Sequence, residues 1–384
     1  MPFYQSKGKI PPKRHTVFKK NNHEIYFEEL ISRQGFSHLY TNAYHINMPT
    51  RIKKIGELQC FEKDSQSYGR QHRHIKTQKI KSKENAGLDF RLKLFSNEDV
   101  MISVADLSKE MSFFFKNASY DELIYVQFGN ALFESNFGEI LLNEGDYLVV
   151  PRGVIWKLSE TNKFKCLILE SKSPISTPRR YRNEFGQLLE HSPYCERDIV
   201  TPVLKDPIDK SGEFEIKVKY CHGIQSYVYD RHPFDIVGWD GYYFPWKLSI
   251  YDFEPITGSI HQPPPVHQTF QGNGFVVCSF VSRLFDYHPD AIPAPYPHSN
   301  VDSDELIYYS KGNFMSRKGV ESESITLHPM GLPHGPQPGK YEESIGKKNT
   351  DELAVMIDTF KPLKPTSIMV ENEEKNYYKS WVND

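Results

Sequence analysis

The feature that most constrains the fold of this chain is an internal repeat. The segment DELIY occurs at Asp121 to Tyr125 and again at Asp304 to Tyr308, 183 residues further on. A second element follows each copy, as Pro-x-Gly-x-x-Trp at Pro151 to Trp156 and as Pro-x-Gly-x-x-His at Pro329 to His334. Matched elements in the same order and at similar offsets indicate a duplication. The sequence therefore predicts two related domains.

Short strand-like segments follow one another closely from about Asp89 onward, among them VMISVADL, YLVVPRG and KCLILES. Such segments, separated by Gly, Pro and Asn, indicate an antiparallel all-β sandwich or barrel. Before Glu84 we expect only one short helix, near Glu28 to Arg33, because no long segment has a helical period. The aromatic-rich segment from Gly238 to Pro255 is interpreted as core or as a seam between domains.

Charge and hydropathy exclude several classes of protein. The formal net charge of −2 gives no support for nucleic acid or an anionic membrane as the partner. The basic stretch Arg70 to Lys83 has no interleaved aromatic residues, so we interpret it as a solvated strand or a subunit contact. The longest apolar run, Phe275 to Val281, is too short to span a bilayer. Five cysteines without paired spacing indicate reduced thiols, and we expect a cytoplasmic protein.

The second copy of the repeat resembles the two motifs of the cupin superfamily. Its first motif reads His298-Ser-Asn, four residues, Glu305, six residues and Gly, and its second is the Pro-x-Gly-x-x-His that ends at His334. Asn300 stands where cupins usually have another histidine, so the resemblance implies two imidazoles and one carboxylate as metal ligands. This facial triad favours non-haem Fe(II), whereas structural zinc prefers a closed site rich in cysteine.

In the first copy two of the ligand positions hold aromatic residues. Alignment on Glu122 places Phe115 opposite His298 and Trp156 opposite His334. A single carboxylate cannot hold iron, so we expect a metal-free copy whose cavity is filled by the two aromatic rings. The resulting expectation is a duplicated cupin with jelly-roll barrels and few short helices. The N-terminal β domain would span residues 1–250, with its copy at about 89–170, and the iron-binding domain residues 251–384.

Wider stretches of the chain resemble the homogentisate 1,2-dioxygenase family. They include PPKRHT, GWDGYYFPWKLSIYDFEP, FDYHPDAIPAPYPHSN and LHPMGLPHGPQPG. The resemblance implies that His298, Glu305 and His334 bind Fe(II) and that His261 is the active-site base. His328 and Phe314 would line the substrate pocket. The implied reaction opens the ring of homogentisate with O2 to give maleylacetoacetate, in tyrosine and phenylalanine catabolism, and known members form trimers that pair into hexamers.

Three departures from the family pattern bear on the substrate. Ser299 stands where better-studied members have Arg, the spacing from His298 to Glu305 is one residue longer, and Phe314 replaces a Tyr near the bound substrate. A lost hydroxyl or guanidinium removes a hydrogen-bond donor from a pocket. The alternatives that remain are a gentisate-like dioxygenase acting on a related para-dihydroxybenzene acid, a metal-dependent bicupin isomerase and a non-catalytic bicupin.

Overall fold

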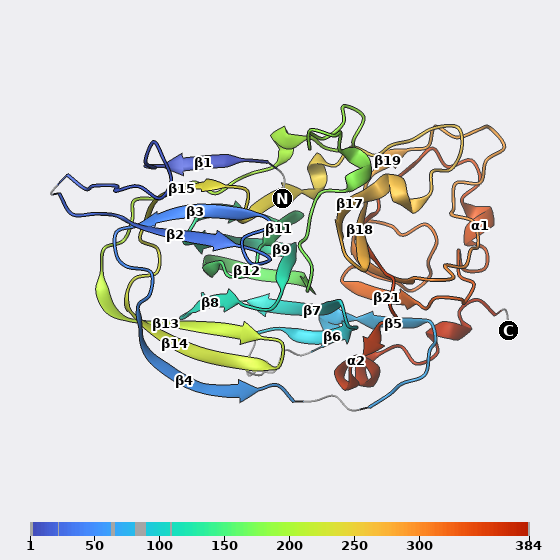
Figure 1. The fold of residues 1–384 in the computed structure, drawn as a ribbon. Helices are drawn as coiled ribbons and strands as arrows, with labels where there is room; N and C mark the ends of the chain where they lie inside the picture. Colours follow the sequence, from blue (N-terminus) through green and yellow to red (C-terminus); the bar gives the residue numbers. More distant parts are fainter. Residues whose placement is uncertain (1–2, 22, 63–65, 81–89, 108–109, 383–384) are drawn as a thin grey trace.

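The structure is a computed structural model, and it describes residues 3–21, 23–62, 66–80, 90–107 and 110–382. These residues form mostly antiparallel strands (Figure 1). Their only α-helices are α1 (Lys340–Glu343) and α2 (Ser367–Asn372). The all-β fold with few short helices is therefore confirmed. No helix among the described residues is long and apolar enough to cross a membrane.

The two copies of the repeat build sheets with the same strand order. In the N-terminal copy the order is β6 (Leu92–Ser96), β7 (Val100–Leu107), β12 (Ile155–Ser171), β9 (Asp121–Ser135), β11 (Asp146–Val150) and β16 (Trp246–Ser249). In the C-terminal copy it is β17 (Gln268–Gly272), β18 (Phe275–Phe280), β23 (Leu353–Thr359), β20 (Asp304–Lys311), β21 (Ser324–His328) and β5 (Arg73–Lys76). This shared order supports the duplication.

Each sheet has an edge strand that comes from the other half of the chain. β5 precedes the N-terminal copy in the chain, yet it pairs with β21 of the C-terminal sheet. In return β24 (Lys364–Pro365) pairs with β6 of the N-terminal sheet. The sheets thus cross the expected domain boundary at residue 250 in both directions, and that boundary stays a prediction.

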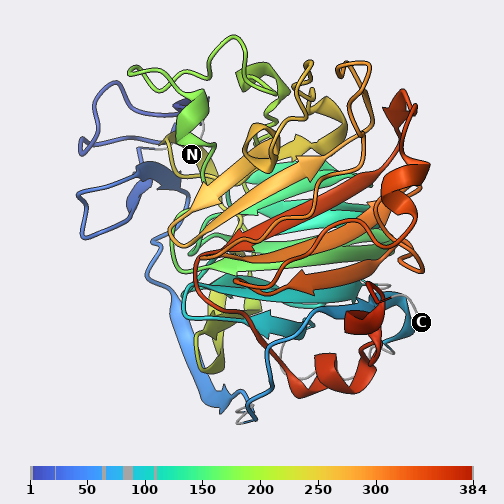
Figure 2. The same cartoon turned by 90° about the vertical axis from the view of Figure 1, so that its right-hand side faces the viewer.

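The two matching sets of six strands pack against each other around one apolar core, and Figure 2 shows the orange and red strands crossing in front of the green and teal ones. The tyrosines that end the two DELIY segments meet at this interface, where the ring centroids of Tyr125 and Tyr308 lie 6.2 Å apart. Trp246 is fully buried, and its ring lies 5.7 Å from that of Phe270. The segment around Trp246 therefore belongs to the core, as the sequence predicted.

Most of the remaining strands extend the N-terminal half. One sheet contains β1 (Gln5–Gly8), β15 (Ile236–Gly241), β3 (Tyr40–His45) and β2 (Phe27–Ser32). The larger sheet continues through β8 (Phe114–Asn117), β13 (Ser211–Tyr220), β14 (Gly223–Arg231) and β4 (Ile52–Cys60), with β10 (Gly138–Leu142) beside β9. β19 (Arg283–Leu284) and β22 (Asn349–Thr350) form a separate pair.

The short helix expected near Glu28 to Arg33 is wrong, because this segment is strand β2. All six of its residues pair with β3 in an antiparallel register. Glu and Leu favour helices in isolation, but backbone pairing with a neighbouring strand overrides so weak a preference.

The basic stretch Arg70 to Lys83 meets acidic side chains of the C-terminal half. Arg73 pairs with Glu373, and Lys76 pairs with Glu321. Lys79 pairs with Glu374. Lys81 and Lys83 lie outside the described residues. The part of the stretch that the structure describes therefore joins the two halves of one chain through ion pairs.

Candidate metal centre and active-site cavity

The structure brings His298, Glu305 and His334 together. His298 Nε2 lies 3.7 Å from Glu305 Oε2, and His334 Nε2 lies 3.4 Å from Glu305 Oε1. One ligand atom from each residue lies within 4.8 Å of the others, a spacing that can hold a metal ion. In the part of the chain that the structure describes, this is the only group of three or more such side chains.

Backbone hydrogen bonds fix the two histidine-bearing segments against each other. His298 N donates to His334 O at 2.8 Å, and His334 N donates to His298 O at 2.9 Å. Gly331 N donates to Asn300 O at 2.7 Å, and Gly331 has a φ of 78°, a conformation that favours glycine. The Pro-x-Gly-x-x-His motif therefore turns the chain so that His334 returns beside His298.

The Nδ1 atoms of both histidines are held by backbone carbonyls. His298 Nδ1 lies 3.0 Å from Tyr296 O, and His334 Nδ1 lies 3.2 Å from Leu332 O. A proton on each Nδ1 satisfies these contacts, and it leaves a lone pair on each Nε2 that faces the Glu305 carboxylate. Two nitrogen lone pairs that face a carboxylate away from bulk water are unfavourable without a cation between them. This donor set therefore fits a metal ion.

Glu305 is ionised even though it is buried. Burial alone raises the pKa of this carboxyl, but the neighbouring imidazoles of His298, His328 and His334 outweigh that effect and hold the pKa well below its ordinary value. The strongest of these contacts joins His328 Nδ1 to Glu305 Oε1 at 2.7 Å. A carboxylate that stays charged is the form that binds a metal ion.

The expected contact between His328 and the substrate needs correction. The His328 side chain is fully buried and forms no part of the cavity wall. It lies directly across the strand pair from Glu305, and the rings of His72 and Trp381 cover it at centroid distances of 5.6 and 6.1 Å. Burial lowers the pKa of His328 to about 3. His328 therefore orients Glu305 as a neutral imidazole.

A cavity of about 330 Å³ opens beside the three converging side chains. His298 and Glu305 lie in its wall, together with the predicted residues His261 and Phe314. The His261 ring stacks on Tyr287 at a centroid distance of 5.2 Å, and its buried Nδ1 has no hydrogen-bond partner among the described residues. Burial lowers the pKa of His261, so the imidazole is neutral at pH 7 and can accept a proton.

The sequence analysis also missed other residues of the wall, among them His267, Tyr309, Arg317 and Asp358. Burial raises the pKa of Asp358 well above its ordinary value, and the charge of Glu305 acts in the same direction. Asp358 lies across from Glu305 on β23, just as Glu170 lies across from Glu122 on β12. Extending the repeat to these two carboxyls would have indicated Asp358, whereas nothing in the sequence marks Arg317.

In the N-terminal copy, a guanidinium group lies where the C-terminal copy has the candidate metal site. Arg91 contacts Glu122 at 2.5 Å and Glu170 at 2.8 Å, and its guanidinium lies 4.7 Å from the centre of the Phe115 ring. The Phe115 and Trp156 rings are both buried and lie 5.3 Å apart. Two aromatic rings and an internal cation thus take the space that a metal and two histidines would need.

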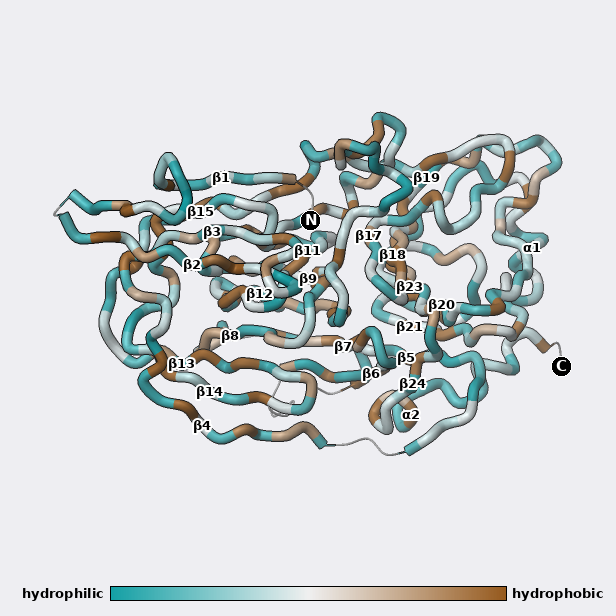
Figure 3. The backbone as a smooth tube through the Cα atoms, in the orientation of Figure 1, coloured by the Kyte–Doolittle hydropathy of each residue, from teal (hydrophilic) through white to brown (hydrophobic). Residues whose placement is uncertain are grey.

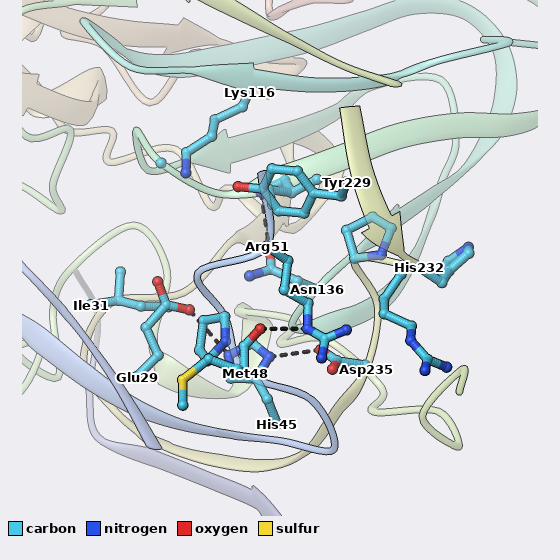
Figure 4. A pocket seen from close by; sticks show the side chains of 15 residues that line it. Glu29, Ile31, His45, Met48, Arg51, Lys116, Asn136, Tyr229, His232 and Asp235 are labelled. Atoms are coloured by element: carbon cyan, nitrogen blue, oxygen red, sulfur yellow. Dashed lines mark hydrogen bonds and ion pairs between the residues drawn. The ribbon is translucent and has the colours of Figure 1, made fainter. Parts of the chain in front are cut away.

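A second cavity, of about 140 Å³, lies in the N-terminal half (Figure 4). His45 bridges two carboxylates in its wall, with Nδ1 2.7 Å from Asp235 and Nε2 3.1 Å from Glu29. Burial alone would lower the pKa of His45, but the two carboxylates raise it to about 9. This histidine is therefore positively charged at pH 7, and its arrangement is that of an ion-paired network.

Comparisons with known proteins found several similar chains. The family described as homogentisate 1,2-dioxygenase N-terminal matches residues 93–252. A Saccharolobus solfataricus protein, named provisionally as a dioxygenase, is 44% identical over 388 residues that cover 99% of each chain. Among solved structures, a cupin 2 conserved barrel domain protein from Leptotrichia buccalis aligns with 12% identity and a TM-score of 0.37, covering 75% of this chain and 96% of that one.

Two homogentisate 1,2-dioxygenases are more distant relatives. The Emericella nidulans enzyme is 25% identical over 68% of this chain, and the Bradyrhizobium diazoefficiens enzyme is 28% identical over 66%. These alignments span 56% and 58% of the two enzymes. The chain therefore aligns with less than two thirds of each of these relatives.

Proposed function

The chain belongs to the homogentisate dioxygenase family of the cupin superfamily and is a dioxygenase, and we propose that it opens the aromatic ring of homogentisate at a ferrous iron. His298, Glu305 and His334 would hold the metal. The reaction would be that of the family, in which both atoms of O2 enter the product, maleylacetoacetate. No organic cofactor is needed, because the ring itself supplies the electrons.

The observation that carries this proposal is the convergence of two imidazole nitrogens and one carboxylate beside a cavity. Three ligands on one face of an octahedral ion leave the remaining positions for substrate and dioxygen. Bound iron would supply the Lewis acidity and the electron transfer to oxygen that ring opening needs. Because Asn300 replaces another histidine, the cavity side of the site keeps more room for a substrate.

His261 would act as the base in this reaction. A phenolic hydroxyl has a pKa near ~10, so a dihydroxybenzene enters the cavity mostly neutral at pH 7. The His261 imidazole lies in the cavity wall and is itself neutral at that pH, because burial lowers its pKa. It can therefore accept the phenolic proton, and Tyr287 stacked on its ring fixes its orientation.

A gentisate-like reaction remains the second candidate, and Phe314 is the reason. Its ring lies in the cavity wall 4.6 Å from that of Tyr309, at the position where better-studied family members have a hydroxyl near the substrate. An apolar wall there changes the ring substituents that fit. Both candidates are para-dihydroxybenzene acids, and both use the same metal ligands and base.

Anaerobic reconstitution with Fe(II), followed by an oxygen electrode, tests the proposal. We expect oxygen uptake with homogentisate and the appearance of an open-chain product, with gentisate measured in parallel. Zn-loaded protein is the control for metal redox chemistry, and it should take up no oxygen. Iron-loaded protein that consumes no oxygen with either acid would contradict the proposal and favour a non-catalytic bicupin. Isomerisation without oxygen would favour the isomerase alternative.

A homo-oligomer, trimeric or hexameric as the family resemblance implies, is part of the same proposal. β4 forms one edge of the larger sheet, and polar residues separate its apolar residues along the strand (Figure 3). Ile52 is 50% exposed and Ile55 60% exposed on this edge. Exposed apolar side chains on an unpaired edge are typical of a surface that another chain covers.

A further inference from the structure

We infer that Arg317 binds the carboxylate of the substrate and so restricts this enzyme to aromatic acids. The inference deepens the proposed function and rests on it for the identity of the reacting ring. Arg317 lies in the loop after β20, only 7% exposed, in the wall of the cavity that also contains His298 and Glu305. Its anchoring role follows from the partners of its guanidinium group.

Among the described residues, every hydrogen bond of the Arg317 guanidinium is with a neutral group. Nε donates to the Tyr309 hydroxyl at 3.2 Å, and Nη1 donates to Gly335 O at 2.6 Å and to Ser316 O at 3.3 Å. Among the described residues no carboxylate lies within 4.0 Å of it, and Nη2 has no acceptor. The indole ring of Trp381 lies 5.8 Å away on another side.

Two other guanidinium groups with little exposure do have acidic partners. Arg283, the other arginine in the cavity wall, contacts Glu352 at 3.4 Å. Arg91 in the N-terminal copy contacts both Glu122 and Glu170. The charge of Glu305 acts on Arg317 without a direct ion pair. A buried charge without a directly paired opposite charge is unfavourable, so the Arg317 position is best explained by an anion that arrives with the ligand.

The chemistry of the site selects a carboxylate as that anion. A guanidinium binds a carboxylate through paired N–H donors in a fixed plane, and Nη2 is the donor still available here. Arg317 is also tied to the carbonyl of Gly335, the residue after the metal-ligand candidate His334. The distance between this cationic anchor and the metal site is therefore fixed by the backbone, as a ligand with a hydroxyl at one end and a carboxylate at the other requires.

Binding measurements on iron-loaded protein without oxygen test this inference. We expect Arg317→Gln to weaken homogentisate binding by roughly 10- to 100-fold, the effect of one or two charge-assisted hydrogen bonds. Binding of hydroquinone, which has no carboxylate, should change less than twofold. Arg317→Lys should fall between the wild type and Arg317→Gln. Lys318→Gln is the matched control, because Lys318 is an exposed cation in the same loop.

A second measurement needs no variant and keeps the inference testable if Arg317→Gln does not fold. Wild-type protein should bind the methyl ester of homogentisate more weakly than the acid, by a similar factor. Equal affinity for acid and ester, or equal weakening of homogentisate and hydroquinone by Arg317→Gln, would overturn the inference and leave the proposed function intact. Selective binding of the acid without oxygen uptake would instead contradict the proposed function and support the role of Arg317.

Discussion

Glu122 and Glu305 occupy the same position in the two copies of the repeat, but they face different partners. Glu122 faces the guanidinium group of Arg91, whereas Glu305 faces the imidazoles of His298, His328 and His334. The two carboxylates therefore form an internal comparison in one chain, since only the second has the surroundings of a metal ligand.

The first prediction uses this pair. Glu305→Gln should abolish iron binding while the fold is retained, because an amide oxygen cannot supply the negative charge that the site gives to the metal. Glu122→Gln should leave about one iron per chain, the content expected of the wild type. Iron analysis after gel filtration, together with circular dichroism, measures both. Loss of iron in the Glu122 variant with a native spectrum would contradict this assignment.

A second prediction concerns the stability of the N-terminal copy. Arg91→Met removes the cation between two fully buried carboxyls, Glu122 and Glu170, so it should lower the free energy of unfolding by about 3–5 kcal/mol. Urea unfolding of the variant and the wild type measures the difference. A decrease in the free energy of unfolding of less than about 1 kcal/mol, as is typical of exposed ion pairs, would mean that this cluster does not stabilise the N-terminal copy.

The third prediction concerns the base. His261→Ala should retain iron, because His261 is not among the ligands, and it should slow turnover by a factor on the order of 10²–10⁴. His288→Ala is a suitable control, since His288 has a side chain that is 66% exposed and it forms no part of the cavity wall. Steady-state oxygen uptake compares the variants. Equal rates for the wild type and the His261 variant would remove the assigned role.

The fourth prediction is a pH dependence of stability from His45. The folded pKa of about 9 lies above the ordinary value of 6.5, so the stabilisation is complete below pH 6.5 and is lost as the pH rises through about 9. The shift corresponds to about 3 kcal/mol. His45→Gln should therefore reduce the free energy of unfolding at pH 6 far more than at pH 10. A difference between the two proteins that does not change with pH would contradict the ion-paired network.

The repeat and its motifs predicted the duplicated β fold and the side chains that converge. Glu305 and the motif of His334 lie on neighbouring strands or directly after them, so their spacing in the sequence translates into proximity. The sequence could not place His328 correctly, because the rings that bury it, His72 and Trp381, come from distant parts of the chain. Strand alternation predicts which face His328 lies on, but it does not predict what covers that face.

The loops explain the other omissions. Arg317 belongs to a loop whose path depends on contacts with Tyr309 and Gly335, and no short sequence motif predicts those contacts. The pairing of β5 with the C-terminal sheet could also not be predicted from the sequence, because long-range packing decides which strand forms the edge of a sheet. Local patterns thus predicted the strands, while the walls of the cavity depend on tertiary structure.

The most direct test of the account is an anomalous difference map from crystals of the iron-loaded protein, measured on both sides of the iron absorption edge. We predict one peak per chain, within bonding distance of His298 Nε2, His334 Nε2 and a carboxylate oxygen of Glu305. A map with no peak there, or with its peak in the N-terminal copy beside Glu122, would contradict the central claim.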